Sequence, residues 1–396
     1  MAETTAAPID RILQHIKYLS VDIGPRGSTT EGERKGAEYC QAEMQRAGLA
    51  PVTERFRSAK SIFLPHLIGS GLFLAAFILY PTGGRVTAFI AFLVSAISLA
   101  SELLELGFID NPFRWIIPKG TSQNVVGIIP AEAEHRQDLV LIGHIDTQRT
   151  PLVFSTPRWV EVYKNFTTVA FVLFSLQVVL YLGGWATGWG WIWPVSGVSA
   201  AGAALLALLC IQADLTPFTA GANDNASSVG MVLTLAEQLS QHPLKHTRVF
   251  SVCTGCEEVQ HYGAIDFFKR HRAEMVRPRG LVFELLGCAG PAYLEKEGII
   301  VPFHSDPELV RLVKEAGAQG SAKPPYPVSI SGGNSEMADC VRFKVPAISI
   351  FGLKPDGEAP YWHQAGDTFD KMNPAVLRDT YQLVWQAIQC LDQEAG

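Results

Sequence analysis

The sequence predicts an α/β domain with a mixed, largely parallel central sheet, interrupted by two long insertions that hold few charged residues. Three observations support this class. Short apolar runs alternate along the chain with segments whose apolar residues recur at helical spacing. Such alternation is typical of α/β domains, whose functional loops lie at the ends of strands. The chain of 396 residues is also 48% hydrophobic and only 18% charged, so it holds more apolar surface than one core needs.

Helices are predicted where apolar residues recur every three or four positions. The segment 9–16 has this spacing after a polar start that does not resemble a signal peptide. Residues 30–48 begin with the residue types of a capping box and end at a glycine. Residues 229–239 and the segment from Pro374 onward complete the helical set. Strands are predicted at five apolar runs: NVVGII, LVLIGHI, RVFSVC, GLVFELL and PAISIFG.

The two insertions, residues 61–106 and 164–213, are predicted to be transmembrane helical hairpins. In the first, uncharged stretches lie on either side of the turn-like sequence PTGGR. In the second, no charge occurs between Lys164 and Asp214, and the middle holds four of the eight tryptophans. About 20 residues span a bilayer core, and tryptophans gather at its surfaces. Four spans are therefore favoured over buried core helices or an apolar substrate channel.

Hairpins return the chain to the side it left, so the remaining segments should form one discontinuous domain from residues 1–60, 107–163 and 214–396. Lysines and arginines flank the spans on this side, whereas only Arg85 lies at a hairpin tip. The positive-inside rule then places the domain on the cytoplasmic face of an integral membrane protein. The net charge of −6 provides no basic surface for nucleic acid. Seven scattered cysteines suit a reducing compartment better than a disulfide framework.

Polar residues stand at the ends of the predicted strands. In LVLIGHIDT, His144 and Asp146 are two positions apart, so in a strand they face the same side. A carboxylate can orient a histidine ring in this way at a metal site, although the pair alone would more often be a surface histidine beside an aspartate. Asp224 lies in the glycine-bounded loop GANDNASSVG, where a helix cap is the alternative role. Glu284 lies inside an apolar strand, where an unpaired carboxylate is costly.

The sequence TGCEEVQHYGA places two adjacent glutamates, Glu257 and Glu258, directly after an apolar run, and His363 lies near the C-terminus in the turn-rich PYWHQAGDTF. Adjacent buried carboxylates repel each other unless a positive charge is near. Histidines and carboxylates at several strand ends are the ligands of divalent metals. One glutamate would then coordinate a metal, while its neighbour accepts a proton from an activated water.

In these motifs the sequence resembles the co-catalytic two-zinc aminopeptidases, whose relatives include glutamate carboxypeptidase, glutaminyl cyclase and the transferrin-receptor ectodomain. The resemblance covers the whole non-membrane part, including the early LSVDIGPRGSTTEGERKGAEY, and five motifs occur in the family's order. It implies a three-layer zinc-peptidase domain with two divalent metal ions, zinc being the expected metal. The implied ligands are His144, Asp224 as the bridging carboxylate, Glu258, Glu284 and His363, with Asp146 orienting His144 and Glu257 as the general base.

The resemblance implies a metallo-aminopeptidase that hydrolyses N-terminal residues of peptides, which are its expected substrates. The predicted hairpins, which have no counterpart in the relatives, add the lipid bilayer as a partner. Three alternatives stay open: a glutaminyl cyclase-like or other amide hydrolase, a non-catalytic receptor or scaffold, and a transporter. Retention of the base and of all five ligands argues against a scaffold. Spans without acidic or basic residues argue against a transporter. The oligomeric state is left open between a monomer and a homo-oligomer.

The sequence departs from the family pattern at a few positions. Glu284 stands where an aspartate is usual, which is one methylene shorter. Gln260 and His261 stand where glycine and leucine are common, and for His261 a supporting or surface role is favoured over direct approach to the site. Glu336, in GGNSEMADC, is a candidate substrate contact. The cysteines of CTGC are expected to be small buried residues rather than a redox pair.

Overall fold

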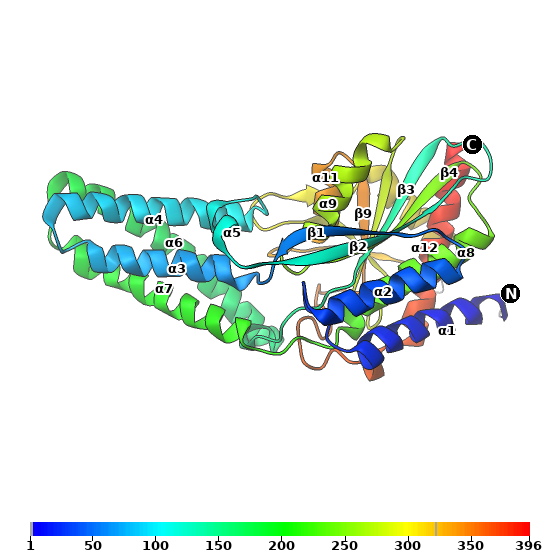
Figure 1. Ribbon diagram of the computed structural model, residues 1–396, viewed down its shortest axis with the longest axis horizontal. Helices are drawn as coiled ribbons and strands as arrows, with labels where there is room; N and C mark the ends of the chain where they lie inside the picture. Colours follow the sequence, from blue (N-terminus) through cyan, green and yellow to red (C-terminus); the bar gives the residue numbers. More distant parts are fainter. Residues whose placement is uncertain (1–2, 321–322) are drawn as a thin grey trace. The chain divides into compact units, whose positions relative to one another are not determined.

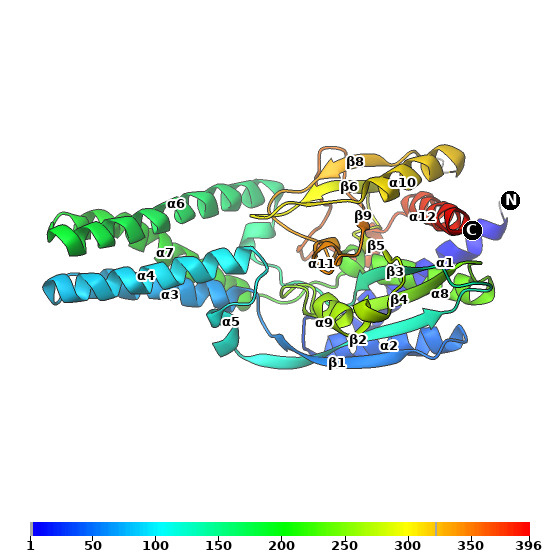
Figure 2. The same cartoon turned by 90° about the horizontal axis from the view of Figure 1, so that it is seen from above.

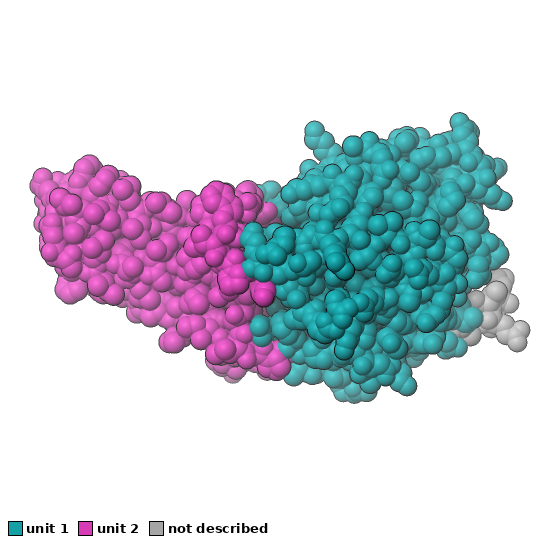
Figure 3. Space-filling model, in the orientation of Figure 1, with its two compact units in different colours: residues 1–58, 119–149, 218–396 teal, residues 59–118, 150–217 magenta. Residues whose placement is uncertain are grey.

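The computed structural model describes residues 3–320 and 323–396 (Figure 1). The chain divides into two compact units (Figure 3). The α/β unit comprises residues 1–58, 119–149 and 218–396, and the helical unit comprises residues 59–118 and 150–217. Residues 107–118 and 150–163 thus belong to the helical unit, whereas the sequence prediction assigned them to the other domain. For the second of these segments, the reason is that the helix Pro157–Thr187 begins before the predicted insertion, which started at residue 164. The polar first turns of this helix were therefore assigned to the other domain.

A mixed sheet of nine strands forms the centre of the α/β unit within the described residues. Its order is β1-β2-β4-β3-β5-β9-β6-β7, with β8 paired to β6. The four central strands β4, β3, β5 and β9 run parallel, and β2 and β6 join them antiparallel. The strands are β1 (Val52–Ala59), β2 (Lys119–Ile129), β3 (Gln137–His144), β4 (Thr247–Thr254), β5 (Arg279–Glu284), β6 (Ala292–Glu297), β7 (Phe303–His304), β8 (Tyr326–Ser329) and β9 (Ala347–Phe351).

Helices cover both faces of this sheet (Figure 2). Alternating residues of β3 show the two layers, because Leu139 and Leu141 belong to one buried cluster and Val140 and Ile142 to another. The first cluster includes side chains of α1 (Glu3–Lys17), α2 (Glu31–Arg46), α8 (Ser227–Gln241), α10 (Pro307–Gly320) and α12 (Pro374–Ala395). The second includes side chains of α9 (Tyr262–His271) and α11 (Met337–Arg342). The α/β class with a mixed, three-layer arrangement is therefore confirmed.

The elements predicted from apolar patterns are present. The five predicted strands correspond to β2, β3, β4, β5 and β9. Helix α2 begins after Thr30, whose side chain accepts a hydrogen bond from the Glu33 amide. The Glu33 carboxylate accepts from the Thr29 amide instead of completing the reciprocal bond to Thr30. Strand β1 was not predicted, because its sequence VTERFRSA is mostly polar at the edge of the sheet.

The helical unit contains α3 (Phe63–Leu79), α4 (Gly84–Leu106), α5 (Pro112–Ile116), α6 (Pro157–Thr187) and α7 (Ile192–Asp214). Helix α3 packs against α4 and α7, and α6 packs against the same two helices. Aromatic rings stack between α3 and α6, with centroids 4.2 Å apart for Phe73 and Phe174. Large apolar side chains also face outward: Val179 is 65% exposed and Leu208 is 63% exposed. An exposed apolar surface of this kind is unusual for a soluble domain.

Three helices, α4, α6 and α7, are long and apolar enough to cross a membrane, judged by length and composition. Helix α3 corresponds to the remaining predicted span, but with 17 residues it is shorter than these three helices. It ends at Leu79, before the turn at the proline and glycines of PTGGR. Helix α4 continues five residues beyond the uncharged stretch 86–101, so Glu102 and Glu105 lie in its last turns. The Oε2 atom of Glu102 lies 2.6 Å from Nδ1 of His66 in α3.

Candidate metal centre

The polar residues predicted at strand ends lie at one edge of the sheet, where the parallel strands end. His144 is the last residue of β3 and Glu284 the last residue of β5, while Glu257 and Glu258 directly follow β4. Carboxyl ends of parallel strands meet at the same edge, which is the usual place of sites in α/β domains. Asp224 joins them from η3 (Ala222–Ala226), the turn that precedes α8. His363 lies in the segment between β9 and α12.

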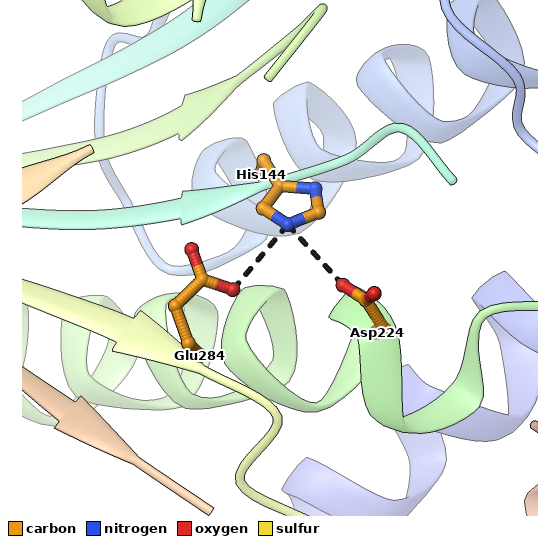
Figure 4. A group of neighbouring side chains, drawn as sticks. All are labelled: His144, Asp224 and Glu284. Atoms are coloured by element: carbon orange, nitrogen blue, oxygen red, sulfur yellow. Dashed lines mark ion pairs between the residues drawn. The ribbon is translucent and has the colours of Figure 1, made fainter. Parts of the chain in front are cut away.

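Asp224 stands between the two histidines. One of its carboxylate oxygens, Oδ1, lies 3.4 Å from Nε2 of His144, and the other, Oδ2, lies 3.4 Å from Nε2 of His363. Glu284 approaches the first histidine, with Oε2 3.4 Å from Nε2 of His144 (Figure 4). Glu258 approaches the second, with Oε2 3.2 Å from Nε2 of His363. The cluster therefore has two halves that share one aspartate.

Asp146 fixes both His144 and the two glutamates. The Nδ1 of His144 lies 3.0 Å from the backbone carbonyl oxygen of Asp146. A carbonyl only accepts, so Nδ1 carries the hydrogen and Nε2 presents its lone pair to the cluster. The carboxylate of Asp146 accepts from the amides of Glu257 at 3.0 Å and Glu258 at 3.2 Å, and from the Ser28 hydroxyl at 2.6 Å. This carboxylate thus orients the loop that carries the glutamates.

Several supporting residues were not recognised in the sequence. Asp367 accepts hydrogen bonds from the amides of Asn223 and Asp224, at 2.6 and 2.9 Å, and so holds the bridging residue. The side chain of Asn225 donates to Glu284 at 2.7 Å, and that of Gln148 donates to Glu258 at 3.0 Å. Asp367 follows His363 in the same turn-rich loop, which is the one signal that could have pointed to it.

Arg26 supports the site from the motif GPRG near the N-terminus. Its guanidinium is fully buried and donates to the backbone carbonyls of residues 19, 24, 145, 220 and 221. The carbonyl of residue 145 lies between His144 and Asp146, and those of residues 220 and 221 lie just before Asp224. Burial lowers the pKa of Arg26 to about 10, which still leaves it charged at neutral pH. One buried cation thus joins three segments that are distant in the sequence.

The side chains of the cluster fit a divalent metal. Burial raises the pKa of Glu258 to about 7, and burial also raises the pKa of Glu284 well above its usual range. The Oε1 atoms of both glutamates are buried without a hydrogen-bond partner. Ligand atoms of His144, Asp224 and Glu284 lie within 4.8 Å of one another, as do those of Asp224, Glu258 and His363. Imidazole and carboxylate donors in groups of three are typical of sites for zinc and similar ions.

Four further residues singled out in the sequence are also buried. His261, for which a surface role was considered, is 2% exposed, and its Nε2 lies 3.1 Å from Oε1 of Glu257. Glu336 is fully buried. Cys253 and Cys256 are both buried free thiols, and burial raises the pKa of Cys256 well above its usual range. A thiol of raised pKa is a poor nucleophile, which agrees with the expectation that CTGC is not a redox pair.

Comparison with known proteins gives one family and many related structures. Residues 208–388 match peptidase family M28. No curated protein matches the sequence significantly. Among solved structures, the fold is similar to a glutaminyl cyclase from Tannerella forsythia, at 15% identity and a TM-score of 0.58, with 96% of this chain and 98% of that chain covered.

Aminopeptidases are similar to a comparable degree. A zinc aminopeptidase from Bacillus subtilis matches at 12% identity and a TM-score of 0.57, covering 97% of this chain and 95% of its own. An aminopeptidase from Aneurinibacillus matches at 14% identity and a TM-score of 0.56, covering 96% and 93%. At such identities the likeness concerns the fold. The match over residues 208–388 and the zinc aminopeptidases among the similar folds agree with the resemblance to zinc peptidases that the motifs predicted.

Proposed function

We propose that the chain is a metal-dependent exopeptidase that removes N-terminal residues from peptides. The observation that carries this proposal is the position of Asp224, whose two carboxylate oxygens face different histidines, with Glu257 close by. Such a shared carboxylate suits a pair of metal ions acting together on one substrate. The family match and the aminopeptidases among the related structures support a hydrolase of peptide bonds.

Two divalent ions, with zinc as the expected metal, would each have a histidine, a glutamate and a share of Asp224. His144 and Glu284 would hold one ion, and His363 and Glu258 the other. Bound ions of this kind act as Lewis acids on a scissile carbonyl and make water a stronger nucleophile. Asp146 and Gln148 keep their partners in place, since both hydrogen-bond to groups of the cluster. Glu284, which stands where an aspartate is usual, accepts a hydrogen bond from the side chain of Asn225.

Glu257 is the proposed general base. Its Oε2 lies 3.8 Å from Nε2 of His144, close to the cluster. Its side chain is 12% exposed, whereas those of the five proposed ligands are between 2% and 9% exposed. It is therefore the member of the group that a substrate and water reach most easily. Glu257 accepts a proton from the attacking water and returns it to the amine that leaves.

The charge of the cluster favours a free N-terminus. Four carboxylates, of Asp224, Glu257, Glu258 and Glu284, gather around two histidines. Asp146, which hydrogen-bonds to the amides of Glu257 and Glu258, adds a fifth carboxylate beside them. Two divalent ions would therefore leave one negative charge, which a substrate ammonium group complements. We therefore infer that the enzyme trims peptides from the amino end rather than cleaving within them.

A glutaminyl cyclase-like reaction is the second candidate, because glutaminyl cyclases are among the proteins of similar fold. Such a reaction joins the N-terminal amine to the glutamine side-chain carbonyl and releases ammonia, without shortening the chain. Two complete groups of possible metal ligands favour the hydrolase. The products of the two reactions differ in mass, so one assay distinguishes them.

The decisive experiment incubates a mixed peptide library, including peptides with N-terminal glutamine, with the purified full chain and follows the products by mass spectrometry. We expect stepwise loss of N-terminal residues that stops when a chelator is added and resumes with zinc. Glu257→Gln is the matched variant, and we expect it to keep its metal content while its rate falls about 10²–10⁴-fold. Products that have lost ammonia alone would replace the aminopeptidase by a cyclase. Near-normal turnover by Glu257→Gln would contradict its role as the base.

We further propose that the helical unit anchors the enzyme in a membrane, with both hairpins entering from the cytoplasm. The support is the length and composition of α4, α6 and α7, and α3 would span a locally thinned bilayer, as short helices do. The excess of lysine and arginine on the proposed inner side gives the orientation. A reporter inserted at Gly188, the residue that ends α6, tests it. Activity of a reporter that functions only outside the cytosol is expected, and a cytosolic signal would reverse the topology.

A further inference from the structure

His261 lies over the proposed base because of a tight turn after β4. The amides of Gln260 and His261 both donate to the backbone carbonyl of Glu257, at 3.0 and 2.9 Å. Both residues have positive φ angles, 84° and 56°, which few side chains adopt. His261 then immediately precedes α9. The chain therefore accepts unfavourable backbone angles at two successive residues to bring this imidazole back to Glu257.

The imidazole of His261 joins two carboxylates from different parts of the chain. Its Nε2 lies 3.1 Å from Oε1 of Glu257, and its Nδ1 lies 2.6 Å from Oδ2 of Asp339. Asp339 comes from α11, on the same face of the sheet as α9, and is fully buried. Carboxylates accept hydrogen bonds, so both ring nitrogens act as donors here. Burial alone lowers the pKa of His261, but the charges of Asp339 and Glu257 outweigh it and raise this pKa well above its usual range.

The contact holds one oxygen of Glu257 and leaves the other directed at the cluster. Oε1 faces His261, whereas Oε2 lies 3.8 Å from Nε2 of His144. A glutamate side chain has three rotatable bonds, and a general base must keep its oxygen within hydrogen-bond reach of the proton it accepts. A fixed donor at Oε1 restricts those rotations. Asp146 does not provide this restraint, because it accepts from the Glu257 amide rather than contacting the Glu257 carboxylate.

We propose that His261, held in place by Asp339, is a positioning residue that fixes the carboxylate of Glu257 for proton transfer. The inference rests on the proposed function for its catalytic consequence, but the restraint itself is a property of the three side chains. Asp339 acts through His261, and His261 acts through Glu257. No member of the pair His261 and Asp339 belongs to the groups of possible metal ligands. Removal of the imidazole should therefore leave metal binding intact.

The test compares His261→Leu with a control that removes the same kind of group elsewhere. His271, at the end of α9, also lies between two carboxylates, with Nδ1 2.6 Å from Glu274 and Nε2 2.7 Å from Glu54. We expect His261→Leu to lower kcat about 10–100-fold with KM and metal content nearly unchanged, as for other residues that orient catalytic groups. His271→Leu should leave kcat within about twofold, because it changes burial and charge without touching Glu257.

Asp339→Asn supplies the second comparison. It keeps the size of the side chain but removes the charge that holds the imidazole, so kcat should fall in the same direction. Combined with His261→Leu it should add little, because residues that act as one unit are not additive. Equal kcat for His261→Leu and His271→Leu, or full additivity of the double variant, would overturn the proposal.

A structural readout separates this proposal from the proposed function. In crystals of His261→Leu, the Glu257 carboxylate should occupy more than one orientation, whereas crystals of the unmodified chain should show one. An unchanged Glu257 in the variant overturns the positioning role even if the protein is a peptidase. If the unmodified chain shows no peptidase activity, the loss of a single Glu257 orientation still supports the restraint, and only the reaction is reassigned.

Discussion

The α/β unit and the helical unit differ in which side chains they bury and which they expose. The α/β unit buries charge: Arg26, Asp146 and Asp367 are fully buried, and two glutamates of the candidate metal centre have raised pKa values. The helical unit exposes apolar groups, with Val86 70% and Ile78 68% exposed. Burial of charge is unfavourable without compensation, and exposure of apolar surface is unfavourable in water. Each unit thus departs from the usual burial of apolar and exposure of charged side chains. It does so where a ligand is expected, which is a metal ion in the α/β unit and lipid around the helical unit.

The compensating components differ in kind. In the α/β unit, the buried Oε1 atoms of Glu258 and Glu284, which have no hydrogen-bond partner, fit a positively charged ligand. In the helical unit, the outward-facing valines and leucines indicate a missing apolar surrounding. The comparison therefore predicts that removal of metal affects the α/β unit, and that changes in packing between helices affect the helical unit.

Metal removal is expected to have the larger effect and to be confined to the α/β unit. Saturation at about a thousandfold excess over Kd stabilises a folded protein by about 4 kcal/mol. A chelator should therefore lower the unfolding temperature, and hydrogen exchange should increase in η3 and in the segment after β4. Exchange in α6 and α7 should not change. Added zinc should restore protection.

The variant Asp224→Asn gives the matched control, because it removes a charge from both halves of the cluster. Hydrogen exchange in the Asp224→Asn variant should change little when the chelator is added. A chelator effect that spreads equally over the helices of the helical unit, or that persists in Asp224→Asn, would contradict the separation of the two units.

A smaller effect is expected from packing in the helical unit. A methyl group at Gly184 of α6 would lie 1.8 Å from the hydroxyl of Tyr80, whose ring stacks on Tyr181 with centroids 4.4 Å apart. Gly184→Ala should therefore destabilise the protein in detergent by about 1–3 kcal/mol. The neighbouring Gly183 has open space around it, so Gly183→Ala should be neutral or slightly stabilising.

Unfolding in detergent, followed by circular dichroism, compares the two variants, and their peptidase rates provide the second readout. Both variants should keep the kcat of the unmodified chain at temperatures below unfolding. The same unfolding curve for Gly183→Ala and Gly184→Ala would show that the close packing between α3 and α6 does not contribute to stability.

Much of the α/β unit could be predicted because its strands are continuous apolar runs. The runs that became β3, β4, β5 and β9 are almost entirely buried on both faces, as parallel strands are. The run in the antiparallel β2 is buried except at Ile128. The edge strands escaped prediction, because β7 has two residues and β1 alternates polar residues. Three of the four predicted spans correspond to helices long enough to cross a bilayer, and α3 is shorter. An uncharged stretch shows where a helix avoids charge but not where the helix ends.

The residues of the candidate metal centre were recognisable for a related reason. His144 and Glu284 each end an apolar strand, so a polar side chain there is conspicuous. Gln148, Asn225 and Asp367 lie in polar loops, where nothing in the local sequence distinguishes them from ordinary turn residues. His261 was noticed as a departure from the family pattern, but its contact with Glu257 depends on a turn with two positive φ angles. Such backbone angles follow from tertiary structure.

The shared aspartate has a consequence for the order of events during synthesis. Asp224 joins His144 to His363, and Asp367 holds it from close to the end of the chain. A ribosome releases the helices of the helical unit, which end at Asp214, well before these last partners. Domains tend to fold as they emerge, so the nascent chain completes its helices while it still lacks a working centre. The proposed metal centre can therefore be complete only after residues 363–367 have been made, and a product terminated before them lacks His363 and Asp367.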